Sequence, residues 1–127
     1  MKTILIIDDE AYFSESVKTA LDPKKYKVLS ATGGEEGLKK IEELSPDAVL
    51  LDLNMPVLDG MGVLKKLREK KIKVPVLITS NLSSKQTISD GIALGVRGYI
   101  IKSDETPQTI ADSIEDLFLK QDRKSLV

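Results

Sequence analysis

Residues 48–52 read Ala-Val-Leu-Leu-Asp, four apolar residues that end at an acid, and this stretch decides the fold. A short run of apolar side chains without polar alternation is typical of a strand that is buried on both faces. Four similar runs, rich in branched side chains, lie elsewhere in the chain, at residues 4–7, 28–31, 74–79 and 99–101. Burial on both faces indicates a parallel sheet with helices packed against each side.

The segments between these runs have the periodicity of amphipathic helices. Apolar residues recur three or four positions apart in them, as they do at Phe13, Val17 and Leu21. Thr106 and Pro107 are a typical N-cap and first residue of a last helix. Strands that are joined by helical crossovers run parallel. The sequence therefore predicts an α/β fold, a doubly wound (βα)5 parallel sheet of five strands in a three-layer sandwich.

The composition limits the functions that this fold can have. The 127 residues predict one domain, residues 1–121, followed at 122–127 by a polar tail or the start of a linker. The chain has no cysteine and no histidine, which excludes disulfides, thiolate zinc sites and histidine-based catalysis. The net charge of −1 argues against contact with nucleic acid. No apolar run approaches the ~20 residues that cross a bilayer, so we expect a cytoplasmic domain without membrane contact.

The predicted strands end at polar residues that suit one kind of chemistry. Because the carboxyl ends of parallel strands meet at one edge, these residues should lie together, where such sheets bind ligands. Grouped carboxylates repel one another, and with oxygen ligands only, Mg²⁺ is the natural counter-ion. A carboxylate in this setting is a candidate nucleophile for phosphoryl transfer, with an ammonium group and a hydroxyl to bind phosphoryl oxygens. The residues are, in chain order, Asp8, Asp9, Asp52, Thr79, Ser80 and Lys102.

Each of these residues also has a simpler explanation. Asp8 and Asp9 fit the cap of the next helix, where acids interact with the positive end of the dipole. A single Asp after a strand, such as Asp52, is usually a loop residue, and a single lysine is usually exposed on the surface.

Three motifs resemble those of the receiver domain of two-component response regulators. They read Ile-Leu-Ile-Ile-Asp-Asp-Glu at 4–10, Asp-Leu-Asn-Met-Pro-Val-Leu-Asp-Gly at 52–60 and Gly-Val-Arg-Gly-Tyr-Ile-Ile-Lys at 95–102. They span nearly the whole chain in the order of the family. The resemblance implies strand order 2-1-3-4-5, as in the chemotaxis regulator. It also implies a signalling switch that works by phosphorylation.

The resemblance further implies the residues that react. Asp52 would accept the phosphoryl group. Mg²⁺ would be held by Asp8, Asp9, Asp52 and the main-chain carbonyl of Asn54. Lys102 would be the ammonium group that binds a phosphoryl oxygen.

The resemblance also implies two residues that respond. The family places a hydroxyl at the end of the fourth strand, and counting from Pro75 and from Lys102 favours Ser80 over Thr79. Tyr99 matches an aromatic switch position, and plain packing is the other explanation for it.

The partners implied are a histidine kinase or phosphotransfer protein, and a downstream protein target or an output domain outside this chain. Phosphorylation would change the shape of the surface formed by the fourth helix, fifth strand and fifth helix, which is the expected output surface. The chain would be a monomer, with dimerisation on phosphorylation left open. It would catalyse only its own phosphorylation and slow dephosphorylation, so we do not class it as an enzyme.

Three positions depart from the family pattern. Ser103 stands where a proline usually follows the lysine, and Asn81 stands where a small residue usually follows the hydroxyl. Leu82 stands beside the path of the water that attacks the phosphoryl group. Because an apolar side chain cannot orient a water, we expect slow autodephosphorylation.

Three other functions fit parts of the pattern. A pseudo-receiver that binds proteins without phosphorylation is the main alternative. A phosphatase of the aspartyl-phosphate type needs a second acid two residues after its nucleophile, where Asn54 stands. A flavin or nucleotide site places backbone amides under a phosphate, whereas acids follow the first strand here.

Overall fold

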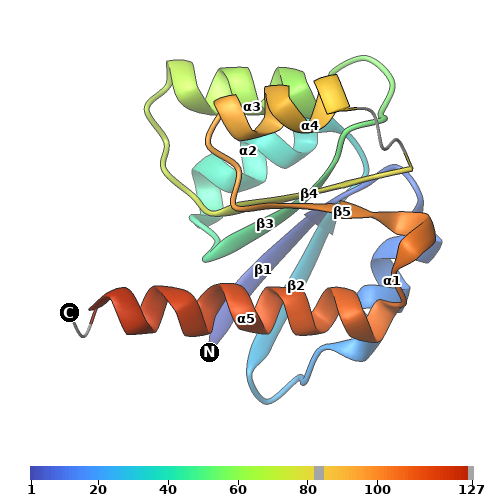
Figure 1. Ribbon diagram of the computed structural model, residues 1–127, viewed down its shortest axis with the longest axis vertical. Helices are drawn as coiled ribbons and strands as arrows, with labels where there is room; N and C mark the ends of the chain where they lie inside the picture. The colour runs from blue at the N-terminus through green and yellow to red at the C-terminus, as the bar shows by residue number, and fades with distance from the viewer. Residues whose placement is uncertain (82–84, 126–127) are drawn as a thin grey trace.

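The computed structural model describes the backbone of residues 1–81 and 85–125, and the side chains of residues 1–81 and 89–122. Strands and helices alternate (Figure 1). Their bounds are β1 Lys2–Ile7, α1 Ala11–Ala20, β2 Tyr26–Ala31, α2 Gly34–Leu44, β3 Ala48–Asp52, α3 Gly60–Glu69, β4 Val76–Ser80, α4 Lys85–Ala93, β5 Gly98–Ile101, a short 3-10 helix Lys102–Asp104 and α5 Pro107–Ser125. Leu82 lies outside the described residues.

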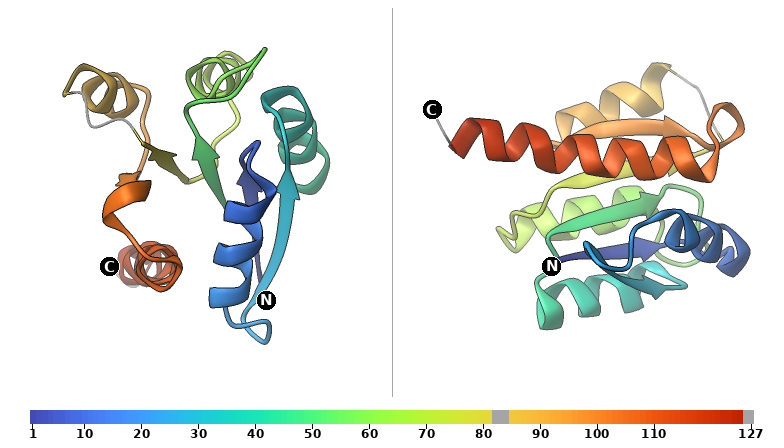
Figure 2. Two further views of the ribbon diagram at one scale, coloured as in Figure 1. Left: turned by 90° about the vertical axis from the view of Figure 1, so that its right-hand side faces the viewer. Right: turned by 90° about the horizontal axis from the view of Figure 1, so that it is seen from below.

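The five strands form one parallel sheet in the order β2-β1-β3-β4-β5, which confirms the predicted fold and strand order. Figure 2 shows α1 and α5 on one face of the sheet and α2, α3 and α4 on the other. The described helices are all too short or too polar to cross a membrane.

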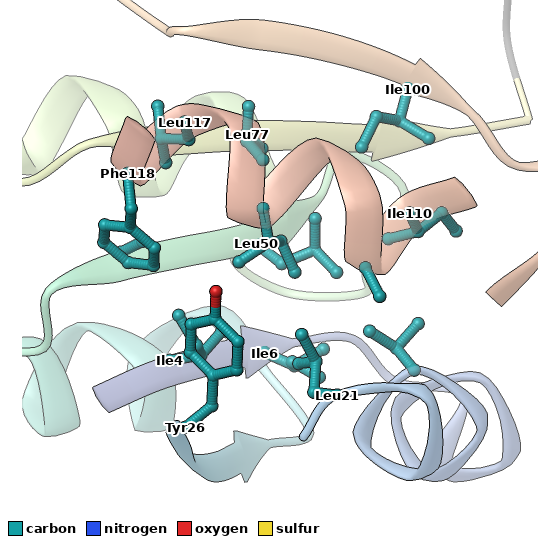
Figure 3. Close-up of a cluster of buried hydrophobic side chains, with 14 residues drawn as sticks. Ile4, Ile6, Leu21, Tyr26, Leu50, Leu77, Ile100, Ile110, Leu117 and Phe118 are labelled. Atoms are coloured by element: carbon teal, nitrogen blue, oxygen red, sulfur yellow. The ribbon is translucent and has the colours of Figure 1, made fainter. Parts of the chain in front are cut away.

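Two hydrophobic clusters fill the space between the three layers. Successive residues of a strand point to opposite faces, so Ile4 and Ile6 pack toward α1 and α5 whereas Leu5 and Ile7 pack toward α2 and α3. Figure 3 shows the first cluster, in which side chains of α5 meet those of the central strands. Two buried clusters on either side explain why the strands read as unbroken apolar runs.

The ends of several elements differ from the prediction, since β1 and β2 each begin two residues earlier and β5 begins one residue earlier. β4 begins at Val76 and not at residue 74, because Pro75 has no N–H to donate to a neighbouring strand. α5 begins at Pro107 as predicted, and Thr106 and Thr109 each donate a backbone N–H to the other's hydroxyl, at 2.8 and 3.1 Å. The helix continues to Ser125, so residues 122–125, assigned to a polar tail, are helical.

Gly60, the first residue of α3, allows that helix to pack against the end of β3. A Cβ atom at Gly60 would lie 2.5 Å from the main-chain oxygen of Asp52 and 2.8 Å from the Cα atom of Leu53. We expect Gly60→Ala to lower the free energy of unfolding by about 2–3 kcal/mol in urea titrations, because backbone atoms must move to admit the methyl group.

Gly33→Ala is the matched control for this substitution. A Cβ atom at Gly33 meets nothing within 4 Å. We expect a loss of about 1 kcal/mol or less, from poorer capping of α2. Equal losses in the two variants would contradict the steric explanation.

Candidate functional site

Four carboxylates meet at the carboxyl ends of the central strands. Asp8 follows β1 and Asp52 is the last residue of β3, and these two strands are neighbours in the sheet. One carboxylate oxygen from each of Asp8, Asp9, Glu10 and Asp52 lies within 4.8 Å of the others. Asp8 and Asp52 are buried, with exposed fractions of 1% and 3%, whereas Asp9 and Glu10 are exposed. The structure thus brings the three predicted aspartates together and adds Glu10.

Lys102 supplies a cation to this cluster. Its Nζ atom lies 2.7 Å from Asp8 Oδ2, 3.3 Å from Glu10 Oε1 and 3.7 Å from Asp52 Oδ2. Its side chain is only 8% exposed, and its ammonium group lies 4.3 Å from the centre of the Phe13 ring. The resting lysine is therefore closer to Asp8 and Glu10 than to Asp52.

The buried carboxylates have raised pKa values. Burial raises the pKa of Asp52 to about 6, although the hydrogen bond from the backbone N–H of Asn54, at 3.1 Å, opposes the rise and the charge of Asp8 adds to it. Burial also raises the pKa of Asp8, against its hydrogen bond with Lys102. Burial lowers the pKa of Lys102, but its hydrogen bond to Asp8 and the nearby negative charges outweigh this and leave the pKa above its ordinary value.

The donor set fits a hard divalent cation. The groups that converge are all carboxylates, and a single ammonium group does not balance four of them. Oxygen-only ligands that retain several waters are the typical environment of Mg²⁺ in proteins. Burial is the main cause of the raised pKa of Asp52, and the charges of Asp8 and Asp9 add to it, so a cation bound among these carboxylates would favour the charged form of Asp52.

Two hydroxyls stand at the end of β4, on opposite faces of the sheet. Ser80 is fully buried, and its Oγ atom accepts a hydrogen bond of 3.3 Å from the side-chain amide of Asn54. Thr79 pairs with Asp52 in the strand register and is 1% exposed. Within the described residues, its Oγ1 atom has no hydrogen-bond partner. Ser80 is thus the hydroxyl that contacts the loop after Asp52.

Thr79→Val is expected to raise the free energy of unfolding by about 1 kcal/mol, because it replaces a buried hydroxyl without a partner by a methyl group of the same shape. Urea titrations of Thr79→Val and of the control Ser80→Ala would measure this effect. A clear loss of stability in Thr79→Val would mean that the hydroxyl has a partner in solution.

Three further residues from the sequence analysis lie in β5, in the loop after β3 and after Lys102. Tyr99, in β5, is half-buried and packs against the hydrophobic cluster on the side of α2 and α3. Asn54 is exposed directly after the Asp52 strand end. Ser103, the residue at the usual proline position, lies inside the short 3-10 helix that Lys102 begins.

Glu10 and Phe13 are the site residues that the sequence analysis did not assign. Glu10 stands next to the acidic pair, so the motif itself contains the signal for it. Phe13 was assigned only to the apolar face of the first helix. Its contact with Lys102 depends on how α1 and β5 lie in space, and no local pattern encodes that.

The chain was then compared with known proteins. The family model for the response regulator receiver domain matches residues 4–115. The chain is 38% identical over 122 residues to the probable transcriptional regulator ycf27 of Porphyridium aerugineum, which covers 96% of this chain and 50% of that protein. It is 37% identical over 101 residues to the alkaline phosphatase synthesis transcriptional regulatory protein PhoP of Bacillus subtilis. The match covers 80% of this chain and 42% of that protein. The chain spans about half the length of these relatives.

Solved structures of a receiver domain and of a chemotaxis protein have a similar fold. A CheY-like response regulator receiver domain protein of Methanospirillum hungatei superposes with a TM-score of 0.87 at 26% identity, over 98% of each chain. The chemotaxis protein CheY4 of Vibrio cholerae superposes with a TM-score of 0.82 at 27% identity, over 91% of this chain and 98% of that chain.

Proposed function

We propose that this chain, which belongs to the response regulator receiver domain family, is a signalling switch that accepts a phosphoryl group on Asp52 from a histidine kinase or phosphotransfer protein. The observation that carries the proposal is the setting of Asp52. It is a buried carboxylate at a strand end, within 4.8 Å of three other acids and 3.7 Å from a buried ammonium group. Such a site combines a nucleophile with the charges that phosphoryl transfer requires.

Asp8, Asp9, Asp52 and the main-chain carbonyl of Asn54 would hold Mg²⁺, and the Glu10 carboxylate is near enough to contribute. When bound, the ion would screen the negative charge of Asp52 from an incoming phosphoryl group. The burial of Asp8 and Asp52 supports this assignment, because it raises the pKa of both carboxyl groups and a bound cation would offset the cost of keeping them charged.

In the transfer itself, the residues of this chain supply the nucleophile and position the groups that bind the phosphoryl oxygens. An Asp52 carboxylate oxygen attacks the phosphorus atom of a phosphohistidine, an O–P bond forms, and the P–N bond breaks to release the histidine of the donor. Lys102, held at 3.7 Å from Asp52, moves toward a phosphoryl oxygen. The Ser80 hydroxyl exchanges its contact with Asn54 for a second phosphoryl oxygen.

The signal leaves through the face of α4, β5 and α5. A phosphoryl group brings a charge of about −2 at neutral pH, which draws Ser80 and the chain after β4 toward the site. Tyr99 then packs inward from its half-buried position in β5. Exposed apolar residues support a contact surface here, because Ile92 in α4 is 65% exposed and Leu119 in α5 is 51% exposed.

The recipient of the signal is a protein surface. The curated relatives are about twice as long as this chain, and two of them are named transcriptional regulators. We therefore propose that the target of the signal is either an output domain in the full protein or a separate protein.

The experiment that tests the proposal measures intact protein mass after incubation with acetyl phosphate, with and without Mg²⁺. We expect one added phosphoryl group in the wild type with Mg²⁺, and none in Asp52→Asn. The matched control is Asp59→Asn, since Asp59 is exposed and Asn also accepts the N-cap hydrogen bond that Asp59 accepts from Gly62.

An adduct that persists in Asp52→Asn would contradict the assignment of Asp52. If neither acetyl phosphate nor a phosphohistidine donor protein adds a phosphoryl group while Mg²⁺ binds, the pseudo-receiver alternative replaces the proposal.

A further inference from the structure

A hollow of about 620 Å³ lies at the opposite end of the sheet from Asp52. Val76, in its wall, is the first residue of β4, whereas Asp52 is the last residue of the parallel strand β3. The hollow is bordered by α3, by the connection from α3 to β4 and by the turn from α4 to β5, which lie at one end of the molecule in Figure 1. We call it the α3–α4 groove. Its volume lies in the range of binding pockets, roughly 300–1,000 Å³.

The floor of the groove is apolar and formed in advance. Leu67 is buried, and Ile72 and Leu94 are half-buried against the same hydrophobic cluster. The backbone N–H of Ile72 donates to the oxygen of Leu67 at 2.9 Å, and that of Lys71 donates to Arg68 at 3.1 Å. This is the Schellman arrangement, which ends a helix and brings two apolar side chains together. The floor therefore needs no rearrangement to receive an apolar ligand.

The rim of the groove carries positive charge alone. Arg68, Lys71, Lys73 and Arg97 line it and are exposed, and its lining within the described residues contains no acid. The chain as a whole has a net charge of −1, so this concentration of cations is local. An occupant with negative charge around an apolar face is complementary to such a surface.

The backbone conformation of Lys71 is a second, independent observation that supports a role for the positive charge of the rim. Its φ of 58° places it in the left-handed region, where a glycine is typical at this position after a helix. A side chain there costs about 1 kcal/mol relative to glycine. A lysine at this position is thus unfavourable for the helix end but supplies a cation to the rim.

We propose that the α3–α4 groove binds an acidic amphipathic helix of a partner protein. Because the rim residues are exposed, the groove is open to solvent, and a small molecule would leave much of its surface in water. A helix that places apolar residues on the floor and carboxylates beside the rim covers both features at once. The groove lies away from Asp52, so binding does not depend on phosphorylation and the proposal is independent of the proposed function.

The test uses a fluorescently labelled model peptide of about 18 residues, long enough to form a helix, with leucine on one face and glutamate on the others. Anisotropy titration measures its affinity for the wild-type chain. The comparison variant is Lys71→Gly with Lys73→Gln, which removes two rim charges. The matched control is Lys24→Gln with Lys27→Gln, which removes two exposed charges outside the groove.

We expect the rim variant to bind the peptide about fivefold more weakly than the control variant, in line with the loss of two exposed ion pairs. Lys71→Gly alone should be at least as stable as the wild type in urea, so that its loss of affinity is not a loss of folding. Amide chemical shifts should change at residues 67–76 and 93–97 when the peptide is added, equally in the wild type and in Asp52→Asn.

Any of five results would overturn the proposal. The binding results are no saturable binding up to millimolar protein, equal weakening in the rim and control variants, and equal binding of a peptide with lysine in place of glutamate. The fourth result is a set of chemical-shift changes confined to α4, β5 and α5, which would place the peptide on the proposed output face. The fifth is self-association of the chain through the groove.

Discussion

Asp52→Asn is expected to raise the free energy of unfolding by about 3 kcal/mol at pH 7 in the presence of a metal chelator, because burial raises the pKa of Asp52 from its ordinary value of 3.8 to about 6 in the folded chain. A carboxyl group whose folded pKa is raised contributes stability that is fully present below its unfolded pKa. That contribution is lost as pH rises through the folded pKa. Near pH 7 the wild-type chain therefore holds a charge where it is disfavoured, and the amide removes it.

The effect should depend on pH between about 4 and 6, the window between the two pKa values. At pH 4, Asp52 is protonated in the folded chain and partly protonated in the unfolded chain, so the advantage of Asp52→Asn should be small there and should fall toward zero at lower pH. Urea titrations at pH 4, 5, 6 and 7 would measure it. Asp59→Asn is the matched control, because Asp59 is exposed and keeps its cap as Asn.

Mg²⁺ should reverse this difference. Adding the ion stabilises only the state that binds it, so the wild-type chain should gain more stability than Asp52→Asn. A difference between the two proteins that is the same at pH 4 and at pH 7 would contradict the electrostatic origin of the effect.

Lys102→Met should change the free energy of unfolding in the opposite direction and lower it. The substitution leaves Asp8 and Asp52 buried without the ammonium group that lies 2.7 and 3.7 Å from them. Removal of one partner from a buried ion pair typically costs about 3 kcal/mol or more, so we expect that loss at pH 7 with a chelator. Urea titration of the variant would measure it, and the loss should shrink at low pH, where the carboxyl groups are protonated.

Lys120→Met provides the matched control for the lysine substitution. Lys120 pairs with Asp116 at 3.0 Å on the surface of α5, and its side chain is 69% exposed. Exposed pairs of this kind contribute about 0.5 kcal/mol. Lys102→Met should also bind Mg²⁺ more tightly than the wild type, because a competing cation has left the site. Similar stability losses in the two lysine variants, or weaker Mg²⁺ binding in Lys102→Met, would contradict the role given to the ammonium group.

The sequence by itself determined the fold class and brought most of the charged residues of the site together. Unbroken apolar runs such as residues 48–51 are typical of strands covered on both faces, and strands joined by helical crossovers run parallel. Because parallel strands share one carboxyl edge, Asp8, Asp52 and Lys102 were predicted to meet without knowledge of any distance. These inferences succeed because they rest on periodicity and chain connectivity, which are local properties.

Only the tertiary structure decided the environments of these groups. The pKa of about 6 at Asp52 comes mainly from its burial in the folded chain and, to a lesser extent, from the carboxylates of Asp8 and Asp9. The contact of Phe13 with Lys102 joins α1 to the end of β5, and the α3–α4 groove joins the end of α3 to the turn after α4. The burial of a group and the electrostatic field at that group depend on atoms that are distant in the chain. The pattern of residues along the chain does not report the positions of those atoms.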